Sequence, residues 1–180
     1  MNDSPKIFIY GVPGSGKTTF SLYMKEKIGY PLVEGDELRT LAQKGTTREE
    51  TPFAYMGMTG AFRKFGELTE ENVIQGLKAV RKNMVPYIQE EIEKYPAELI
   101  LECAFLDPER VTGKGRVILL TKQDEESHWK QFFTHREENE KSLEHFKAAR
   151  IIQDYLIDEA KKYDVEIIEN NFDFKPIQNG

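Results

Sequence analysis

The stretch that decides the fold is KIFIYGVPGSGKTTFSLYMKEKI, residues 6–28. Lys6–Tyr10 is a short β-rich apolar run, and a helix is expected from Thr18 to about Ile28. Between them, residues 11–18 read Gly-Val-Pro-Gly-Ser-Gly-Lys-Thr and match the pattern G-x-x-x-x-G-K-[ST] in full. A preceding strand and a following helix are the context that this pattern requires.

Phosphate binding is the chemistry that this pattern predicts, and residues 11–18 are called the P-loop below. Glycines allow positive φ, so successive backbone N–H groups can point at an anion, and the following helix N-terminus also favours negative charge. Lys17 would reach the β- and γ-phosphates as a catalytic cation, while the Thr18 hydroxyl would bind Mg²⁺. The residues predicted to bind ATP are Gly11, Pro13, Gly14, Ser15, Gly16, Lys17, Thr18 and Thr19.

The rest of the chain alternates short apolar runs with helical patterns, which is typical of an α/β fold with a parallel sheet. Further strands are expected at Pro31–Glu34, Glu98–Cys103, Arg116–Thr121 and Val165–Glu169, and further helices at about Thr69–Tyr95, kinked at Pro86, and Glu144–Tyr163. Two longer segments, 40–68 and 122–143, interrupt this alternation. Such insertions are binding loops and lids in some proteins and plain helical additions in others.

Length and composition narrow the class of protein. The 180 residues, 39% hydrophobic and 31% charged, indicate a single domain over residues 1–180. A formal net charge of -6 argues against a nucleic-acid partner. Cys103 is the single cysteine, and no Cys/His spacing indicates zinc. No apolar stretch is long enough to span a membrane, so we expect a cytoplasmic protein. We expect it to be a monomer or a homodimer.

Asp36 and Arg39 follow the second predicted strand in the segment Gly-Asp-Glu-Leu-Arg. Ligands of open α/β sheets lie at the carboxyl ends of the strands, so Asp36 should face the γ-phosphate. There it could accept the acceptor hydroxyl's proton or help to hold a metal ion, while Arg39 could grip an anionic group on the acceptor. The alternative is that Asp36 caps a helix and Arg39 is a solvated charge.

Glu102 and the segment after the fourth predicted strand indicate which class of nucleotide-binding protein this is. Glu102, after the third strand, is the best candidate for a second metal-associated acid, which gives Thr18, Asp36 and Glu102 as the predicted magnesium site. The segment Thr121-Lys122-Gln123-Asp124 has the Lys and Asp of the guanine-specific Asn-Lys-x-Asp motif but lacks its Asn. We therefore interpret this segment as a coincidental match and favour a kinase over a GTPase.

The sequence resembles the small-molecule P-loop kinases of the nucleoside-monophosphate-kinase type, through GVPGSGKTTF and EGDELR. Within this group, ELILECAFLDP, DEESHWKQFFTHR and ARIIQDYLIDEAKKYDVEIIEN are similar to the archaeal 2-phosphoglycerate kinase family. The resemblance implies a P-loop NTPase fold, a three-layer α/β/α sandwich with a five-stranded parallel sheet in the order 2-3-1-4-5. It also implies that 122–143 is a lid whose arginine, Arg136, closes over the phosphates as a catalytic residue.

The chain departs from that family after the third strand. The family tends to have Glu-Gly-Val-His there, whereas this chain has Glu102-Cys103-Ala104-Phe105. Phe105 thus stands in place of the expected histidine, and the lid supplies one arginine where such kinases commonly use more. The fold and ATP binding are still expected despite these differences. The identity of the acceptor is not carried over from the family.

Other side chains are interpreted as structural or as weaker functional candidates. His128, His135 and His145 lack a metal-binding spacing and are expected on the surface or in the lid. Arg63, in the 40–68 segment, is a candidate contact for an anionic acceptor, and Asn170 and Asn171 are candidate adenine contacts after the fifth strand. Cys103 is expected to be a small buried hydrophobe.

Three functional hypotheses follow. The leading one is an ATP-dependent phosphotransferase acting on a hydroxyl of a small, anionic, 2-phosphoglycerate-like acceptor, with Lys17, Asp36 and Arg136 as catalytic residues. A polynucleotide 5′-hydroxyl kinase would share the P-loop and the Asp-x-x-Arg spacing but would need a basic track. A nucleotide-dependent binding or regulatory protein would use ATP to order the lid without phosphotransfer.

Overall fold

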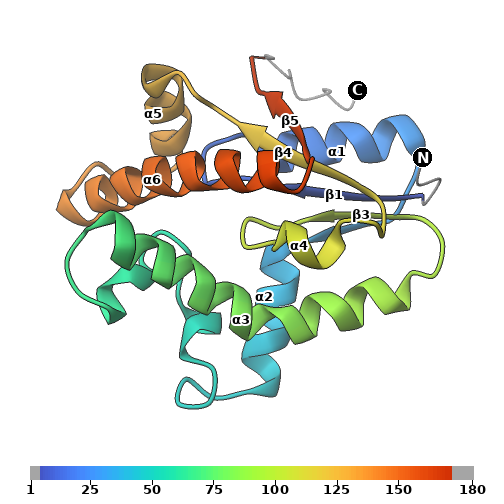
Figure 1. Ribbon diagram of the computed structural model, residues 1–180, viewed down its shortest axis with the longest axis horizontal. Helices are drawn as coiled ribbons and strands as arrows, with labels where there is room; N and C mark the ends of the chain where they lie inside the picture. Colours follow the sequence, from blue (N-terminus) through green and yellow to red (C-terminus); the bar gives the residue numbers. More distant parts are fainter. Residues whose placement is uncertain (1–4, 172–180) are drawn as a thin grey trace.

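The computed structural model describes residues 5–171, in which helices cover both faces of a five-stranded sheet (Figure 1). All strand pairs are parallel, and the order is β2-β3-β1-β4-β5, as the resemblance implied. The strands are β1 (Lys6–Tyr10), β2 (Leu32–Glu34), β3 (Leu99–Glu102), β4 (Arg116–Thr121) and β5 (Glu166–Glu169).

The helices alternate with these strands along the chain. They are α1 (Lys17–Ile28), α2 (Gly35–Gly45), α3 (Glu70–Lys94), α4 (Pro108–Val111), α5 (Glu125–Phe133) and α6 (Glu140–Lys162), with 3₁₀ turns η1 (Pro52–Tyr55) and η2 (Ala61–Lys64). Helix α3 continues through Pro86 as one element. Within residues 5–171, no helix combines the length and the apolar character needed to cross a bilayer.

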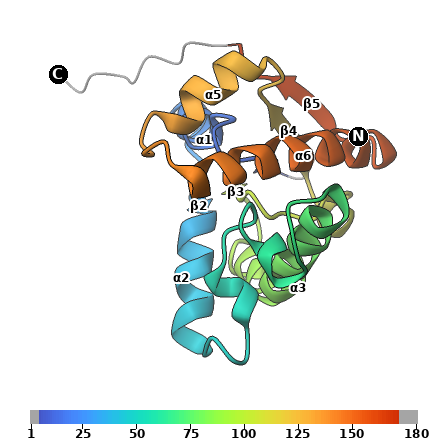
Figure 2. The ribbon, with the colours of Figure 1, turned by 90° about the vertical axis from the view of Figure 1, so that its left-hand side faces the viewer.

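The alternation of side chains along β1 separates two hydrophobic cores. Phe8 and Tyr10 point into the larger core, which contains buried side chains of α2, α3 and α6, whereas Ile7 and Ile9 point into a smaller core with Phe20 of α1. Helix α1 therefore covers one face of the sheet, and α3 and α6 cover the other (Figures 1 and 2). Both faces of the central strands are buried, which explains their continuous apolar runs.

The 40–68 segment forms a folded extension beside α3 (Figure 2). The helix α2 takes up its first residues, and η1 and η2 then pack on α3. Gly76 of α3 permits this contact, because a Cβ there would lie 2.7 Å from the backbone nitrogen of Phe62. The close approach fixes the position of residues 57–59, which precede η2.

One predicted boundary was wrong. Helix α6 begins at Glu140, four residues before the predicted start at Glu144. The Asn139 side chain accepts a hydrogen bond from the Ser142 backbone N–H, and the Ser142 hydroxyl accepts one from the Asn139 N–H. This reciprocal cap satisfies two N–H groups at the start of the helix and so extends it into the polar segment.

Candidate active site

The predicted functional residues meet at the carboxyl ends of β2, β3 and β1. The strand register places Glu102 of β3 beside Glu34 of β2 and beside Ile9 of β1. The chain after β1 leads to α1 on one face of the sheet, whereas the chain after β3 leads to α4 on the other. Neighbouring strands with diverging connections leave a crevice between them, which is where ligands bind in open α/β sheets.

The P-loop backbone requires glycine at positions 14 and 16, among others, for both conformational and steric reasons. Gly14 and Gly16 have φ values of 82° and 89°, in the left-handed region that side-chain-bearing residues rarely adopt. A Cβ on Gly14 would lie 3.0 Å from Cα of Phe132, and one on Gly16 would lie 2.2 Å from Nδ2 of Asn170. The loop is therefore packed tightly between α5 and the chain that follows β5.

Two side chains from distant parts of the sequence hold the P-loop in place. The Asn170 Nδ2 amide donates to the Ser15 carbonyl at 2.8 Å, and the His128 Nε2–H donates to the Pro13 carbonyl at 2.9 Å. Asn170 is buried, and its side chain was predicted to contact adenine rather than the loop. His128, which was predicted to lie on the surface or in the lid, lies in the lid helix α5 and is fully buried.

Arg150 of α6 determines which ring nitrogen of His128 carries the proton. Its Nη1 lies 3.3 Å from His128 Nδ1 and also donates to the Lys122 carbonyl, while Nη2 donates to the Gln123 carbonyl. Since arginine has no acceptor, Nδ1 must accept and Nε2 must carry the proton. Burial lowers the pKa of His128 below its usual value near 6.5, with a further lowering from Arg150 and an opposing contribution from the Pro13 hydrogen bond.

Lys17 and Glu102 bring opposite charges into the buried end of the crevice. The Lys17 ammonium donates to the Val12 carbonyl at 3.0 Å, and burial lowers its pKa while the Glu102 carboxylate raises it. Burial likewise raises the pKa of Glu102, and Lys17 opposes that shift. Each charge therefore offsets part of the desolvation penalty of the other. This allows both side chains to stay charged although they are buried.

A cleft of about 480 Å³ is lined by P-loop residues and by most of the residues that were predicted to bind the acceptor. Its charged and hydroxyl-bearing lining residues are Lys17, Thr18, Glu34, Asp36, Arg39, Thr59, Glu102 and Arg136. Gly57 and Met58 of the 40–68 segment and His145 of α6 also line it. The structure thus brings together Lys17, Asp36 and Arg136, which come from the P-loop, α2 and the segment after α5.

Asp36 and Arg39 lie on α2, which begins immediately at the carboxyl end of β2. The helix starts without a side-chain cap, so the alternative assignment of Asp36 as a capping residue was wrong. The Arg39 guanidinium lies over the Phe105 ring, 5.4 Å from its centroid. Its Nε atom is buried and has no hydrogen-bond partner among residues 5–171, so one donor of Arg39 is unsatisfied at the edge of the cleft.

Arg136 is held at the mouth of the cleft by the end of α5. Its Nη1 donates to the Phe132 carbonyl at 2.7 Å, and its guanidinium lies 4.3 Å from the centroid of the Phe132 ring. Helix α5 itself is anchored by Trp129, Phe132 and Phe133, which contact Phe146 of α6. The predicted lid is therefore a helix packed on the P-loop, and it presents Arg136 toward the same cleft as Lys17.

Arg63 does not line this cleft. Its guanidinium forms an ion pair with Glu144 at 2.5 Å and donates to Nε2 of His145 at 2.8 Å. His145 must then carry its proton on Nδ1, which donates to the Thr59 hydroxyl at 3.1 Å. Arg63 is thus positioned to orient His145 and Thr59, both of which do line the cleft.

The remaining P-loop and lid residues have structural surroundings that the sequence patterns did not reveal. Ser15 is buried, and its hydroxyl has no partner among the described residues, whereas Thr19 is exposed on α1 and does not line the cleft. Lys122 donates to the Asn170 carbonyl, and Asp124 caps α5. Both side chains of the partial guanine motif are therefore engaged in the fold.

Oxygen ligands for a magnesium ion line the cleft, but residues 5–171 do not supply a complete set of protein ligands for one. Thr18, Asp36 and Glu102 all line the cleft, as predicted. Within residues 5–171, no group of three His, Cys, Asp or Glu side chains could hold a metal ion without other ligands. This arrangement fits magnesium, which is usually bound through one or two carboxylates together with substrate phosphates.

Comparison with known proteins finds relatives that are named as kinases. A family profile described as an AAA domain matches residues 10–83, which include the P-loop, Asp36 and Arg39. The 2-phosphoglycerate kinase of Methanocaldococcus jannaschii is 26% identical over 178 residues, covering 91% of this chain and 58% of the relative. The relative of the same name from Methanopyrus kandleri is 24% identical, with 91% and 55% covered. The chain is similar to P-loop small-molecule kinases.

Solved structures show the same fold at low sequence identity. Shikimate kinase from Acinetobacter baumannii, solved in complex with shikimate, has a TM-score of 0.58 and 18% identity, with 95% of this chain and 86% of that chain covered. A gluconokinase from Sinorhizobium meliloti has a TM-score of 0.52 and 15% identity, with 97% and 87% covered. The chain spans little more than half the length of the two curated relatives.

Lowering the pH should destabilise the fold through His128. Its folded pKa lies below the unfolded value, so below about pH 6.5 the unfolded chain gains a proton that the folded chain excludes. The free energy of unfolding should therefore fall as the pH is lowered from about 7 to about 5, by at most about 1.4 kcal/mol per pH unit for one proton. Urea unfolding at a series of pH values measures this slope.

The matched variants are His128→Gln and His135→Gln. The first should flatten the pH dependence relative to the wild type, while the second removes an exposed imidazole from the same segment and should leave the slope unchanged. An equal slope in His128→Gln and the wild type would contradict the assignment of a neutral, buried His128.

Proposed function

We propose that this chain is an ATP-dependent phosphotransferase that phosphorylates a hydroxyl group of a small anionic molecule. One observation carries the proposal: Lys17, Asp36, Arg39 and Arg136 line a single cleft next to the P-loop. The similarity to proteins named as 2-phosphoglycerate kinases supports an acceptor that carries phosphate and carboxylate groups. Nucleic-acid and membrane partners form no part of the proposal.

The donor would be held by the P-loop. The residues that fit the phosphates are the backbone of Gly11–Thr18, the Lys17 ammonium and the Arg136 guanidinium. Thr18 and Glu102 would hold the magnesium ion, which neutralises charge on the nucleotide phosphates when bound, and Asp36 would be left free to act as the base.

The acceptor would lie between α2 and the 57–59 segment. Arg39 would bind an anionic group of the acceptor, since it lines the cleft and its guanidinium is pre-positioned over Phe105. Met58 and Phe105 would form the apolar wall. Arg63 would act as a positioning residue through His145 rather than as a direct contact.

The transfer step needs a base and charge stabilisation. Asp36 would accept the proton of the acceptor hydroxyl as its oxygen forms a bond to the γ-phosphorus and the bond from that phosphorus to the ADP oxygen breaks. Lys17 and Arg136 would stabilise the charge that is redistributed over the transferred group. Packing of α5 on the P-loop would limit the access of water and thus wasteful hydrolysis.

Asp36→Asn should abolish turnover while leaving ATP binding largely intact. Loss of a general base typically lowers the rate by about 10²–10⁴-fold, and the P-loop itself is unchanged. ATP consumption should be measured with a panel of phosphorylated hydroxy acids, including 2-phosphoglycerate, and with shikimate, gluconate and nucleosides. Glu37→Gln, a neighbouring acid on α2 that does not line the cleft, is the control and should keep wild-type turnover.

Tight ATP binding without transfer to any acceptor would overturn the kinase proposal. Wild-type turnover in Asp36→Asn would instead remove Asp36 from the mechanism. A 5′-hydroxyl oligonucleotide in the same panel tests the polynucleotide alternative, and transfer to it alone would replace the small-molecule proposal.

Arg39→Gln should weaken acceptor binding selectively. Losing a charge-assisted hydrogen bond costs about 1.5–3 kcal/mol, so the KM for the anionic acceptor should rise by about 10- to 100-fold while the KM for ATP is unchanged. Arg48→Gln is the matched control, because Arg48 also lies over an aromatic ring, that of Tyr55, but outside the cleft. An unchanged acceptor KM in Arg39→Gln would contradict the proposed contact.

A further inference from the structure

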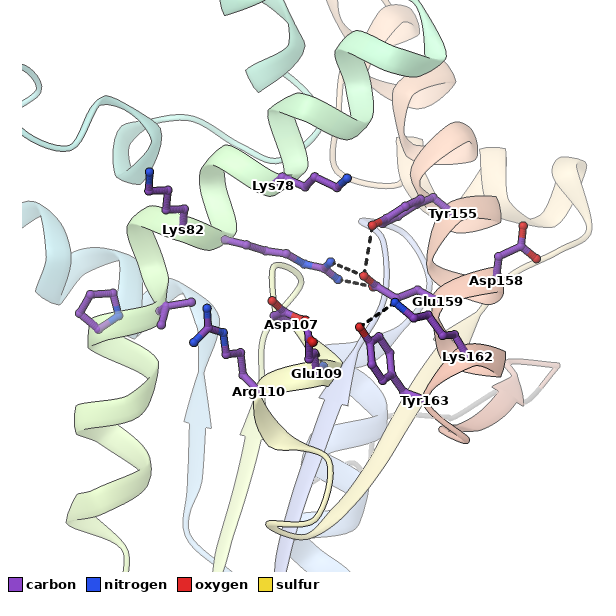
Figure 3. Close-up of a pocket in the computed structure, with 13 residues that line it drawn as sticks. Lys78, Lys82, Asp107, Glu109, Arg110, Tyr155, Asp158, Glu159, Lys162 and Tyr163 are labelled. Carbon is purple, nitrogen blue, oxygen red and sulfur yellow. Dashed lines mark hydrogen bonds and ion pairs between the residues drawn. The ribbon is translucent and has the colours of Figure 1, made fainter.

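A second pocket of about 760 Å³ lies between α3, α4 and α6 (Figure 3). It shares no lining residue with the catalytic cleft, and its volume falls in the range of small-molecule sites. Five basic residues line it, namely Lys78, Arg81, Lys82, Arg110 and Lys162. Four acidic residues line it as well, namely Asp107, Glu109, Asp158 and Glu159.

A buried ion pair forms the floor of this pocket. The Nη1 and Nη2 atoms of Arg81 donate to the two carboxylate oxygens of Glu159 at 2.9 and 2.8 Å, and the Tyr155 hydroxyl donates to the same carboxylate at 3.2 Å. Arg81 is only 4% exposed, and its Nε has no partner among residues 5–171. The Glu159 charge is therefore neutralised within the protein, while Arg81 retains one unsatisfied donor.

Two of the other acids are also engaged. The Asp107 carboxylate accepts the backbone N–H of Glu109 at the start of α4. Asp158 pairs with Lys161, one turn away on the exposed side of α6, at 3.4 Å. Glu109 is the one acidic lining residue whose side chain has no ion pair or hydrogen bond with residues 5–171.

The basic side chains are, by contrast, largely uncommitted. Within residues 5–171, Lys82 and Arg110 form no ion pair and no side-chain hydrogen bond. Lys78 contacts the face of the Tyr155 ring, and Lys162 donates to the Tyr163 hydroxyl, so both keep their charge. The pocket therefore has more available positive than negative charge, in a chain whose formal net charge is -6.

The basic groups approach from more than one side. Figure 3 shows Lys82 and Arg110 on the α3 and α4 side of Glu159, with Lys162 on the α6 side. Separated cations suit a ligand with two anionic groups better than a single ion, and a guanidinium such as that of Arg110 can bind phosphate or carboxylate in a bidentate manner. The rings of Tyr155 and Tyr163 and the side chain of Pro86 supply apolar surface beside them.

We propose that this pocket is a second ligand site, separate from the catalytic cleft, for a small molecule bearing at least two phosphate or carboxylate groups. Lys82, Arg110 and Lys162 are its anion-binding side chains, and the Arg81–Glu159 pair is its fixed floor. The proposal does not depend on phosphotransfer in the cleft, so each can fail without the other.

Inorganic pyrophosphate and citrate are the probes, since they distinguish phosphate from carboxylate ligands. Calorimetric titration should use Lys17→Met protein in magnesium-free buffer, so that the P-loop contributes little. We expect binding of at least one probe to persist, and Lys82→Gln with Arg110→Gln in the same background should weaken it by tenfold or more. Lys147→Gln, an exposed lysine of α6 that lines neither site, should leave the affinity unchanged.

Two further measurements keep the proposal testable if Lys17→Met fails to fold. In the wild type, nuclear magnetic resonance signals of the Tyr155 and Tyr163 rings should shift on addition of the probe, and Glu109→Gln should tighten binding by about threefold because it removes the uncommitted acid. Absence of binding to either probe, or equal affinity before and after removal of Lys82 and Arg110, would overturn the proposal.

Discussion

The site depends on the carbonyl groups of the P-loop being held from outside the loop. His128 and Asn170 donate to the Pro13 and Ser15 carbonyls. In a trans peptide the C=O and N–H groups point in opposite directions, so fixing these two carbonyls directs the N–H groups of Gly14 and Gly16 away from the two side chains. Side-chain hydrogen bonds thereby hold the amides in the orientation that an anion-binding loop needs before any ligand arrives.

The same constraint connects the lid and the end of the sheet to the chemistry. Because His128 lies on α5, the helix cannot leave the P-loop without breaking a buried hydrogen bond. Arg136 is attached to the end of that helix through the Phe132 carbonyl, so its position in the cleft follows from the position of α5. The charge of Lys17 is balanced in turn by Glu102, which the register of β3 places beside β1.

Much of the cleft follows from local sequence patterns. The P-loop and the convergence of Asp36, Arg39 and Glu102 were predictable, because carboxyl ends of parallel strands share one edge of the sheet, whereas the strand order was implied by the resemblance to P-loop kinases. The two loop-holding residues were not. His128 and Asn170 are 115 and 155 residues from their partners, and a polar side chain in a polar segment gives no local sign that it will be buried.

The other differences between the sequence-based expectations and the structure have separate causes. Arg63 was predicted to reach an acceptor, but Glu144 and His145 from α6 engage its guanidinium, and this pairing across the fold leaves no trace in the local sequence. The earlier start of α6 has a local sign, Asn139 with Ser142 three residues later, although this pair departs from the usual capping box, which has Glu or Gln at the third position. Phe105 replaces an expected histidine, and its ring supports Arg39.

Binding of ATP with magnesium to the wild type and to Asn170→Ala, measured by calorimetry, tests the central claim most directly. The account predicts magnesium-dependent binding to the wild type and an affinity about 5- to 150-fold lower in the variant, since losing one hydrogen bond that orients the loop costs about 1–3 kcal/mol. Far-ultraviolet circular dichroism at the same temperature establishes that the variant is folded. No binding by the wild type, or equal affinity in a folded Asn170→Ala protein, would contradict the account.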